Sequence, residues 1–435
     1  MIEVERRDGN GTGRVAMPIV AVCGRWGKTT VARLLEAMLP PVHPRLALWI
    51  DQGVYVNGRR QLGELIPWGE ALRALAGGEL DLAIQELDAG TVNAVGLPHA
   101  AYALGIITSF CGNDEACLAD PRAAVERQAQ LAVARAIHPT GALVLNADDH
   151  AVAGEGAASP GEPIYYAVSR RNPIVKAHLA AEGKAVSISS GMIVLCEGRR
   201  SRPVLPVRDV AISLGGAIVF QVQNALAAVA AAWRLGVPVA RMASALRAFT
   251  SAPTLMPGAC NQLRVGGATV IVDRLQDTLG TRALVRGLRR VRGAHRRLVL
   301  LPVGADLDPP AMTEIGRLLG RSFDLVIAHT LPDPPADTTI RESAAASLPG
   351  SAAVEALRAG LAFNPVPPML LALPGEGPAL DRLLHLLRPD DLALVLAADL
   401  SFALRTLLTH RPPAGPADGS EGRLLPTGTA GPRAT

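Results

Sequence analysis

The chain has 435 residues, of which 49% are hydrophobic but only 3% aromatic, and its formal net charge is +4. A chain of this length is too long to fold around one ordinary hydrophobic core, so we predict two or three domains. A core built from small aliphatic side chains suits buried parallel strands flanked by helices, so we expect an α/β fold. The sequence has no basic run interleaved with aromatic residues and no apolar stretch near the roughly 18 residues of a membrane span. Nucleic acid and membrane are therefore not expected as partners.

Residues 1–17, MIEVERRDGNGTGRVAM, contain acidic residues and glycines where a secretory signal would have an apolar core. The cysteines are odd in number, scattered and without a C-x-x-C pair; they are Cys23, Cys111, Cys117, Cys196 and Cys260. We interpret all five as reduced thiols that do not bind metal. These features predict a cytoplasmic protein.

The first predicted strand leads through a glycine-rich loop into a helix, within the segment VAVCGRWGKTTVARLLEAML at 20–39. The loop consists of Gly24, Arg25, Trp26, Gly27, Lys28, Thr29 and Thr30. Such a loop binds a polyphosphate, because backbone N–H groups turn inward and the start of the helix adds a partial positive charge. We predict that Lys28 contacts the β and γ phosphates and that the Thr29 hydroxyl binds Mg²⁺.

The use of lysine supports a functional phosphate loop. The chain has 43 basic residues, and only Lys28, Lys176 and Lys184 are lysine. The planar guanidinium of arginine does not replace a compact ammonium on a flexible stem. A lysine at position 28 of so arginine-rich a chain therefore indicates a polyphosphate site.

Strand-like and helical segments then alternate, as in a doubly wound sheet. The pattern predicts strands at 45–51, 80–86, 103–110 and 141–149, with a hairpin that turns at Asn57-Gly58 and a helix at 121–137. Short β-like pieces occupy 163–214, followed by a helix at 223–237 and another after Pro238. Beyond a boundary at Pro253 and Pro257, strands are predicted at 268–273, 296–303, 323–330, 368–374 and 392–399.

This pattern predicts four parts. Residues 1–17 form an amino-terminal extension, 18–254 a doubly wound α/β domain with the phosphate loop, and 255–410 a smaller, Rossmann-like α/β domain. The segment 411–435 is rich in Pro and Gly and has little to bury, so we expect a disordered tail.

Four motifs occur in the order and spacing of one known family: the loop at 24–30, VLNADD at 144–149, NALAAVAAAWRLGV at 224–237 and VIVD at 270–273. They resemble the Mur ligase superfamily, in particular the carboxy-terminal, Mur-like half of cyanophycin synthetase. The resemblance implies that the first domain is the central, ATP-binding Mur ligase domain and that the second is the Mur ligase carboxy-terminal domain. It covers residues 18 to about 410.

The resemblance implies an ATP-dependent carboxylate–amine ligase that works through an acyl phosphate. The implied substrates are a small amino acid and a peptide-like or polymeric carboxylate, and the implied cofactors are ATP and Mg²⁺. Lys28 and Glu86 match the catalytic residues, and Thr29 and Glu86 match the ligands of the Mg²⁺ ion. Glu86 has an alternative interpretation as a helix-capping carboxylate.

Two further matches carry a structural alternative. Asn224 matches the asparagine that opens a helix near the nucleotide, but it could simply be the N-cap of that helix. Asp273 matches an aspartate that helps to hold the ATP ribose, but an Asp at the end of a strand is also ordinary turn chemistry. We expect the carboxylates of Asp148 and Asp149 mostly to shape a turn.

The chain also departs from the family pattern. Asn113-Asp114 replaces an Asp-His pair, and Gln130 replaces a lysine that is carbamylated to bridge a second Mg²⁺. Gln276 and Ala259 replace a histidine and an arginine of the family motifs. Of these, only Asp114 could still attract a second ion.

These departures leave a second hypothesis open: a catalytically degenerate, ATP-binding homologue that acts as a regulatory or assembly subunit. A third hypothesis, an unrelated P-loop kinase, leaves the motifs beyond residue 100 unexplained. An oligomer is compatible with each of the three.

Overall fold

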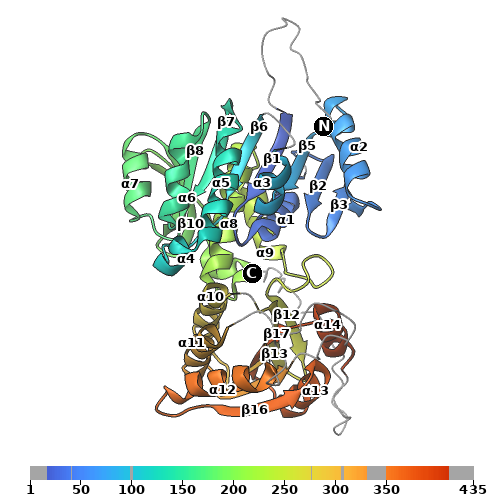
Figure 1. The fold of residues 1–435 in the computed structure, drawn as a ribbon. Helices are drawn as coiled ribbons and strands as arrows, with labels where there is room; N and C mark the ends of the chain where they lie inside the picture. Colours follow the sequence, from blue (N-terminus) through green and yellow to red (C-terminus); the bar gives the residue numbers. More distant parts are fainter. Residues whose placement is uncertain are drawn as a thin grey trace, which may run out of the picture. The chain divides into compact units, whose positions relative to one another are not determined.

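The computed structural model describes residues 17–40, 42–97, 101–275, 277–304, 308–330 and 349–410. The chain divides into two compact units, one up to Phe249 and one from Thr250, which are described separately below (Figure 1). The tail at 411–435, the extension before Met17 and Gln276 lie outside the described residues. Within the described part of the chain, none of the helices has the length and apolar character needed to cross a membrane.

The first unit is built on an eleven-stranded sheet. Across the sheet the strands are β11 (Arg200–Pro206), β10 (Met192–Glu197), β9 (Lys184–Ser189), β8 (Glu162–Ala167), β7 (Ile137–Asn146), β6 (Tyr102–Ile107), β1 (Met17–Cys23), β5 (Leu82–Glu86), β2 (Leu46–Ile50), β3 (Gly53–Val56) and β4 (Arg59–Arg60). The strands from β9 to β2 are parallel, and two antiparallel strands extend the sheet at each end.

The order of the strands confirms the predicted doubly wound arrangement. From β1 the chain runs to β2 and β5 on one side, and then to β6, β7 and β8 on the other. The carboxyl ends of β1 and β6 therefore meet where the direction of winding reverses. In open α/β sheets this is the place where ligands bind.

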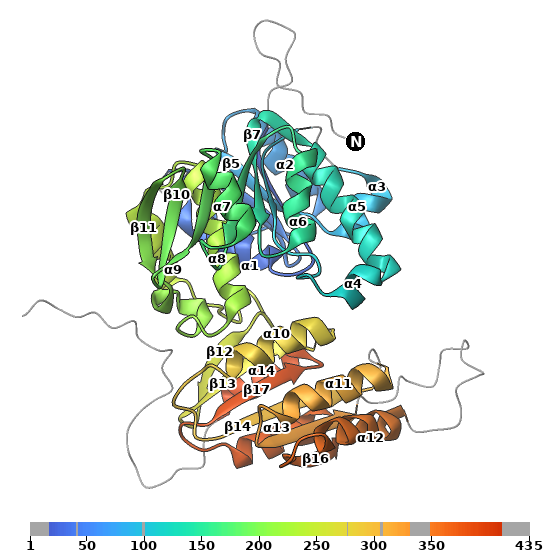
Figure 2. The same cartoon turned by 90° about the vertical axis from the view of Figure 1, so that its left-hand side faces the viewer.

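Helices cover both faces of this sheet (Figures 1 and 2). The main core lies between the sheet and α1 (Lys28–Met38), α8 (Val219–Arg234) and α9 (Val239–Ala248). On the other face lie α2 (Leu65–Ala76), α3 (Ala89–Val95) and α5 (Pro121–Arg135). The buried alanines of α8 let this helix lie close to α1 and to the strands.

The predicted hairpin is confirmed, and its turn explains why it forms. β3 and β4 pair across Asn57 and Gly58, which have φ angles of 49° and 76°. Two consecutive positive φ angles are the requirement of a type I′ turn, for which Asn-Gly is the favoured dipeptide.

The second unit is a smaller α/β unit, as the sequence predicted. Its six-stranded sheet has the order β12 (Asn261–Val265), β13 (Ala268–Arg274), β17 (Leu392–Ala397), β14 (Arg297–Val303), β15 (Leu325–Thr330) and β16 (Met369–Pro374). Only β12 is antiparallel to its neighbour. One face carries α13 (Glu376–Leu386) and α14 (Leu400–Thr409); α10 (Thr278–Leu288), α11 (Pro309–Gly320) and α12 (Pro349–Ala362) complete the unit.

Candidate functional site

The phosphate loop follows β1 directly, and its last three residues, from Lys28 on, form the start of α1. Gly24 and Gly27 have φ angles of 128° and 86°. Residues other than glycine rarely adopt positive φ angles of this size. A Cβ atom on Gly24 would lie 2.2 Å from Thr108 Oγ1. Glycine is therefore needed here both for the backbone conformation and for the close approach of the next loop.

That next loop follows β6 and supports the phosphate loop from the side. The backbone N–H of Arg25 donates to Ser109 O at 2.9 Å, and the N–H of Trp26 donates to Ser109 Oγ at 3.2 Å. Thr108 Oγ1 donates to Trp26 O at 2.7 Å. Sequence reasoning missed Thr108 and Ser109; the only available signal was their place after the strand next to β1.

The structure brings Lys28, Thr29 and Glu86 together. Thr29 Oγ1 donates to Glu86 Oε2 at 2.8 Å, and Lys28 Nζ lies 3.8 Å from Glu86 Oε1. The Glu86 side chain is only 3% exposed, and this burial raises the pKa of its carboxyl, against the opposing effect of the Lys28 charge. The capping alternative for Glu86 is wrong, because Asp88 is the N-cap of α3 and accepts from Thr91 N.

Asn224 lies inside α8, which begins at Val219, so its interpretation as an N-cap is wrong. The helix begins earlier than predicted, and Val222 in its added first turn is buried in the main core. Asn224 Oδ1 lies against the phosphate loop: a Cβ atom on Gly27 would be 2.2 Å from it. Asn224 Nδ2 donates to Gln221 Oε1 at 3.1 Å. The buried amide is thus held beside the loop, and Thr30 of the loop is buried as well.

Asp148 and Asp149 shape the turn after β7, as predicted. Asp149 Oδ2 accepts from Phe110 N at 2.7 Å and from Gly112 N at 2.9 Å. Asp148 Oδ2 accepts from Val168 N at 2.8 Å and from Gln223 Nε2 at 3.2 Å. Together the two carboxylates connect the ends of β6, β7 and β8 to α8.

The residues at the family's second metal position have structural partners. Asp114 is the N-cap of α4 (Glu115–Ala119) and accepts from Cys117 N at 3.1 Å. Asn113 donates to Asp148 O at 2.8 Å and accepts from His150 N at 2.8 Å. Gln130 is buried on α5, and its Nε2 lies 3.5 Å from Ser109 O. In the part of the chain that the structure describes, no three His, Cys, Asp or Glu side chains are arranged to hold a metal ion.

The prediction that all five cysteines are reduced is wrong for two of them. Cys111 and Cys117 form a disulfide, while Cys23, Cys196 and Cys260 are buried and are not disulfide-bonded. The turn before α4 brings the two Cα atoms to 5.6 Å, within the range that a disulfide spans. Cys117 Sγ also lies 3.2 Å from Arg25 Nη1, so the bridge contacts the phosphate loop.

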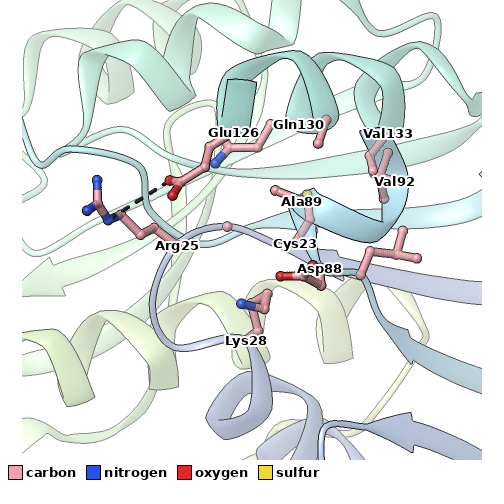
Figure 3. A pocket seen from close by; sticks show the side chains of 12 residues that line it. Cys23, Arg25, Lys28, Asp88, Ala89, Val92, Glu126, Gln130 and Val133 are labelled. Carbon is pink, nitrogen blue, oxygen red and sulfur yellow. Dashed lines mark ion pairs between the residues drawn. The ribbon is translucent and has the colours of Figure 1, made fainter. Parts of the chain in front are cut away.

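A small pocket of about 80 Å³ opens beside this loop (Figure 3). Arg25 and Lys28 of the loop line it together with Asp88, and Glu126 and Gln130 project from α5. Small and aliphatic side chains form the remainder, among them Ala89, Val92, Ala129 and Val133. Cys23 also lines the pocket, but burial raises the pKa of its thiol to about 12, which excludes a reactive thiolate.

Asp273 lies in the second unit, near the end of β13, and is 6% exposed. Its Oδ2 accepts from the Cys260 thiol at 3.0 Å, and its Oδ1 accepts from Arg274 N at 2.7 Å. Burial raises the pKa of this carboxyl to about 6.

The chain is similar in sequence to cyanophycin synthetases. It is 26% identical over 314 residues to the enzyme of Synechocystis sp. and 27% identical over 320 residues to that of Crocosphaera subtropica; each match covers 72% of this chain and 36% of the relative. No family model matches the chain.

Solved structures show the same fold. A pseudomurein peptide ligase type C from Methanothermus fervidus aligns with a TM-score of 0.58 at 17% identity, covering 91% of this chain and 79% of its own. E. coli FolC in complex with ADP aligns with a TM-score of 0.60 at 14% identity, covering 90% and 89%.

The chain is a relative of cyanophycin synthetase with the Mur ligase fold. The resemblance predicted from the four motifs is confirmed, and so is the predicted fold class. The match spans about a third of the length of these relatives, 36% in both cases, so their complete activity does not transfer to this chain as a finding.

Proposed function

We propose that the protein is an ATP-dependent carboxylate–amine ligase that forms an amide bond through an acyl phosphate. The observation that carries the proposal is the contact of Thr29 and Lys28 with the buried carboxylate of Glu86 at the phosphate loop. The relationship to amide-forming ligases supports the same reaction class. The proposed substrates are a small amino acid and a peptide-like or polymeric carboxylate, in a cytoplasmic setting.

The residues present fit ATP and Mg²⁺. Gly27, the N-cap of α1, provides no side-chain capping hydrogen bond, so the N–H groups at the start of this helix are suited to a polyphosphate. Lys28 would contact the β and γ phosphates, and Thr29 and Glu86 would hold one Mg²⁺ ion. When bound, the ion would neutralise phosphate oxygens. Asn224, behind Gly27, would keep the loop in its binding conformation.

The chemistry requires charge neutralisation and positioning more than a protein nucleophile. A carboxylate oxygen is a poor leaving group, and its phosphorylation by ATP makes amide formation downhill. Lys28 stabilises the charge that spreads over the transferred phosphoryl group. The amine, deprotonated to its neutral form, then attacks the carbonyl carbon; the C–O bond to phosphate breaks, phosphate leaves with the electron pair, and the amide nitrogen releases a proton to solvent.

We further propose a single tightly held Mg²⁺ and no dependence on bicarbonate, the source of a carbamate. A neutral Gln130 amide does not supply the anionic oxygen of a carbamate, and Asp114 already caps α4. Two Mg²⁺ ions in a crystal structure with an ATP analogue, the second bound through Asp114, would contradict this.

For the two units we propose the roles implied by the resemblance: the central ATP-binding domain for the first and the carboxy-terminal domain for the second. Asp273 is then a candidate for ribose binding. Asp273→Asn tests this role, because a ribose contact predicts weaker binding of ATP but unchanged binding of inorganic triphosphate.

The departures at Asn113, Asp114 and Gln130 favour one second candidate, a nucleotide-binding subunit without ligase activity. Phosphate release from ATP, measured with a panel of amino acids and short acidic peptides, separates the two. Release that depends on the amine and is lost in Lys28→Ala supports a ligase. Tight ATP binding without turnover supports the regulatory or assembly subunit.

A further inference from the structure

We propose that Glu126 binds the ammonium group of the incoming amine in the pocket beside the phosphate loop. This inference rests on the proposed ligase function and assigns its amine site to a residue without a role so far. Glu126 lies on α5 and lines the same pocket as Lys28 and Arg25 (Figure 3).

The first observation is an unsatisfied carboxylate oxygen. Glu126 Oε2 is shielded from solvent and accepts no hydrogen bond from any residue that the structure describes. Arg25 Nε lies 3.9 Å away, too far for a hydrogen bond, although the side chain as a whole is 30% exposed. Buried polar atoms of folded proteins nearly always have a partner, and an exception requires an explanation such as a missing ligand.

The second observation is the charge around this oxygen. Glu126 projects from α5, while Lys28 enters the pocket from the start of α1 (Figure 3). Lys28 is also the residue expected to hold the phosphates. Arg25 is ion-paired with this oxygen, but at 3.9 Å it leaves the carboxylate oxygen without a direct hydrogen bond. A cationic donor in the pocket would supply that bond and would reduce the repulsion between the carboxylate and a bound polyphosphate.

An ammonium group can supply this bond, because it donates hydrogen bonds and needs only acceptors around it. The amine is the cationic substrate of the proposed reaction. The small volume, about 80 Å³, fits the head of such a substrate, and Ala89 and Ala129 leave room for an aliphatic stem.

Glu126→Gln tests the inference, because it keeps the shape of the side chain and removes the charge. We expect the KM for the amino acid to rise about ten- to hundredfold, the range for a lost charge-assisted hydrogen bond. Glu126→Asp should restore part of the loss. Glu115→Gln is the matched control, since Glu115 is exposed on α4 and does not line the pocket.

Two readouts separate amine binding from support of the loop. Hydroxylamine is uncharged at neutral pH and traps acyl phosphates, so hydroxamate formation should persist in Glu126→Gln. ATP affinity, measured by calorimetry, should also be unchanged. If ATP affinity and hydroxamate yield fall together with amide formation, Glu126 supports the loop and the inference is wrong.

The remaining outcomes distinguish the inference from the proposed function. Amine-dependent turnover in the wild type with an unchanged KM in Glu126→Gln overturns only the role of Glu126. Calorimetric titration of the amino acid panel into the complex with an ATP analogue provides a test without turnover: the wild type should bind amino acids better than their deaminated analogues, and Glu126→Gln should not. A wild type that neither binds nor consumes amines overturns both.

Discussion

The ammonium of Lys28 lies beside the carboxylate of Glu86, with 17% of its side chain exposed. We predict that Lys28→Arg lowers ATP affinity or turnover at least tenfold despite its conserved charge, because the wider guanidinium does not fit the place of an ammonium. Calorimetric titration with ATP and phosphate release measure both quantities. Lys176→Arg, on an exposed part of α7 (Pro173–Ala180), is the control. Equal affinity and turnover in Lys28→Arg would refute the proposed contact.

The buried carboxyl of Asp273 should make the free energy of unfolding depend on pH. Burial raises its pKa to about 6 in the folded state, above the unfolded value. The folded chain therefore holds this proton more tightly, and the free energy of unfolding decreases as pH rises from about 4 to about 6. We predict that Asp273→Asn removes this slope and stabilises the second unit at pH 7 by up to roughly 3 kcal/mol, with little effect at pH 4. Thermal unfolding of both proteins at the two pH values measures the difference; parallel pH profiles would contradict the prediction.

The residues of the site fall into two groups: those that a sequence motif identifies and those that no motif identifies. Lys28, Thr29 and Glu86 could be placed from the sequence because a phosphate loop and a strand ending in Glu fix their neighbourhood. Thr108, Ser109 and Glu126 could not, since hydroxyl and carboxylate side chains on loops and helices occur throughout any chain. Their importance arises only from which strand or helix lies next to the loop.

At the scale of elements, the loop between β6 and α4 connects the disulfide to the phosphate loop. We predict that reduction of Cys111–Cys117 lowers the free energy of unfolding by about 2 kcal/mol, the entropic value for so short a loop. ATP affinity should fall severalfold, because Cys117 and Ser109 both contact the phosphate loop. Calorimetry with and without a dithiol measures both effects.

The double variant Cys111→Ser, Cys117→Ser is the control for that experiment. It should behave like the reduced protein and show no response to the dithiol. Two free thiols at these positions in non-reducing mass spectrometry would contradict the bridge itself.

The order of the main strands could be predicted because hydrophobic periodicity and turn residues reflect local burial. The helix α7 lies inside the stretch that was predicted as short β-like pieces. The start of α8 and the disulfide could not be predicted. Helix boundaries depend on tertiary contacts, here those of Val222 in the main core, and a C-x₅-C spacing becomes a bridge only when a turn brings the two residues together.

At the scale of the molecule, each unit has its own hydrophobic core. The main core of the first unit lies between Val20 and Leu246 in the sequence, and a core of the second lies between Leu263 and Leu407. We predict that residues 17–249, expressed alone, unfold cooperatively with a melting temperature close to that of the same unit in the full chain. Thermal unfolding followed by circular dichroism tests this. A broad, non-cooperative transition would show that the core needs the second unit.

The scarcity of lysine has a practical consequence for chemical footprinting. An amine-acylating reagent finds ε-amino groups only at Lys28, Lys176 and Lys184. Lys176 is exposed, and Lys184 Nζ is paired with Glu162 Oε1 at 2.9 Å. Labelling therefore reports on the phosphate loop through a single peptide, with the other two lysines as internal references. Protection of that peptide by a nucleotide can be followed in a crude mixture, before any substrate is identified.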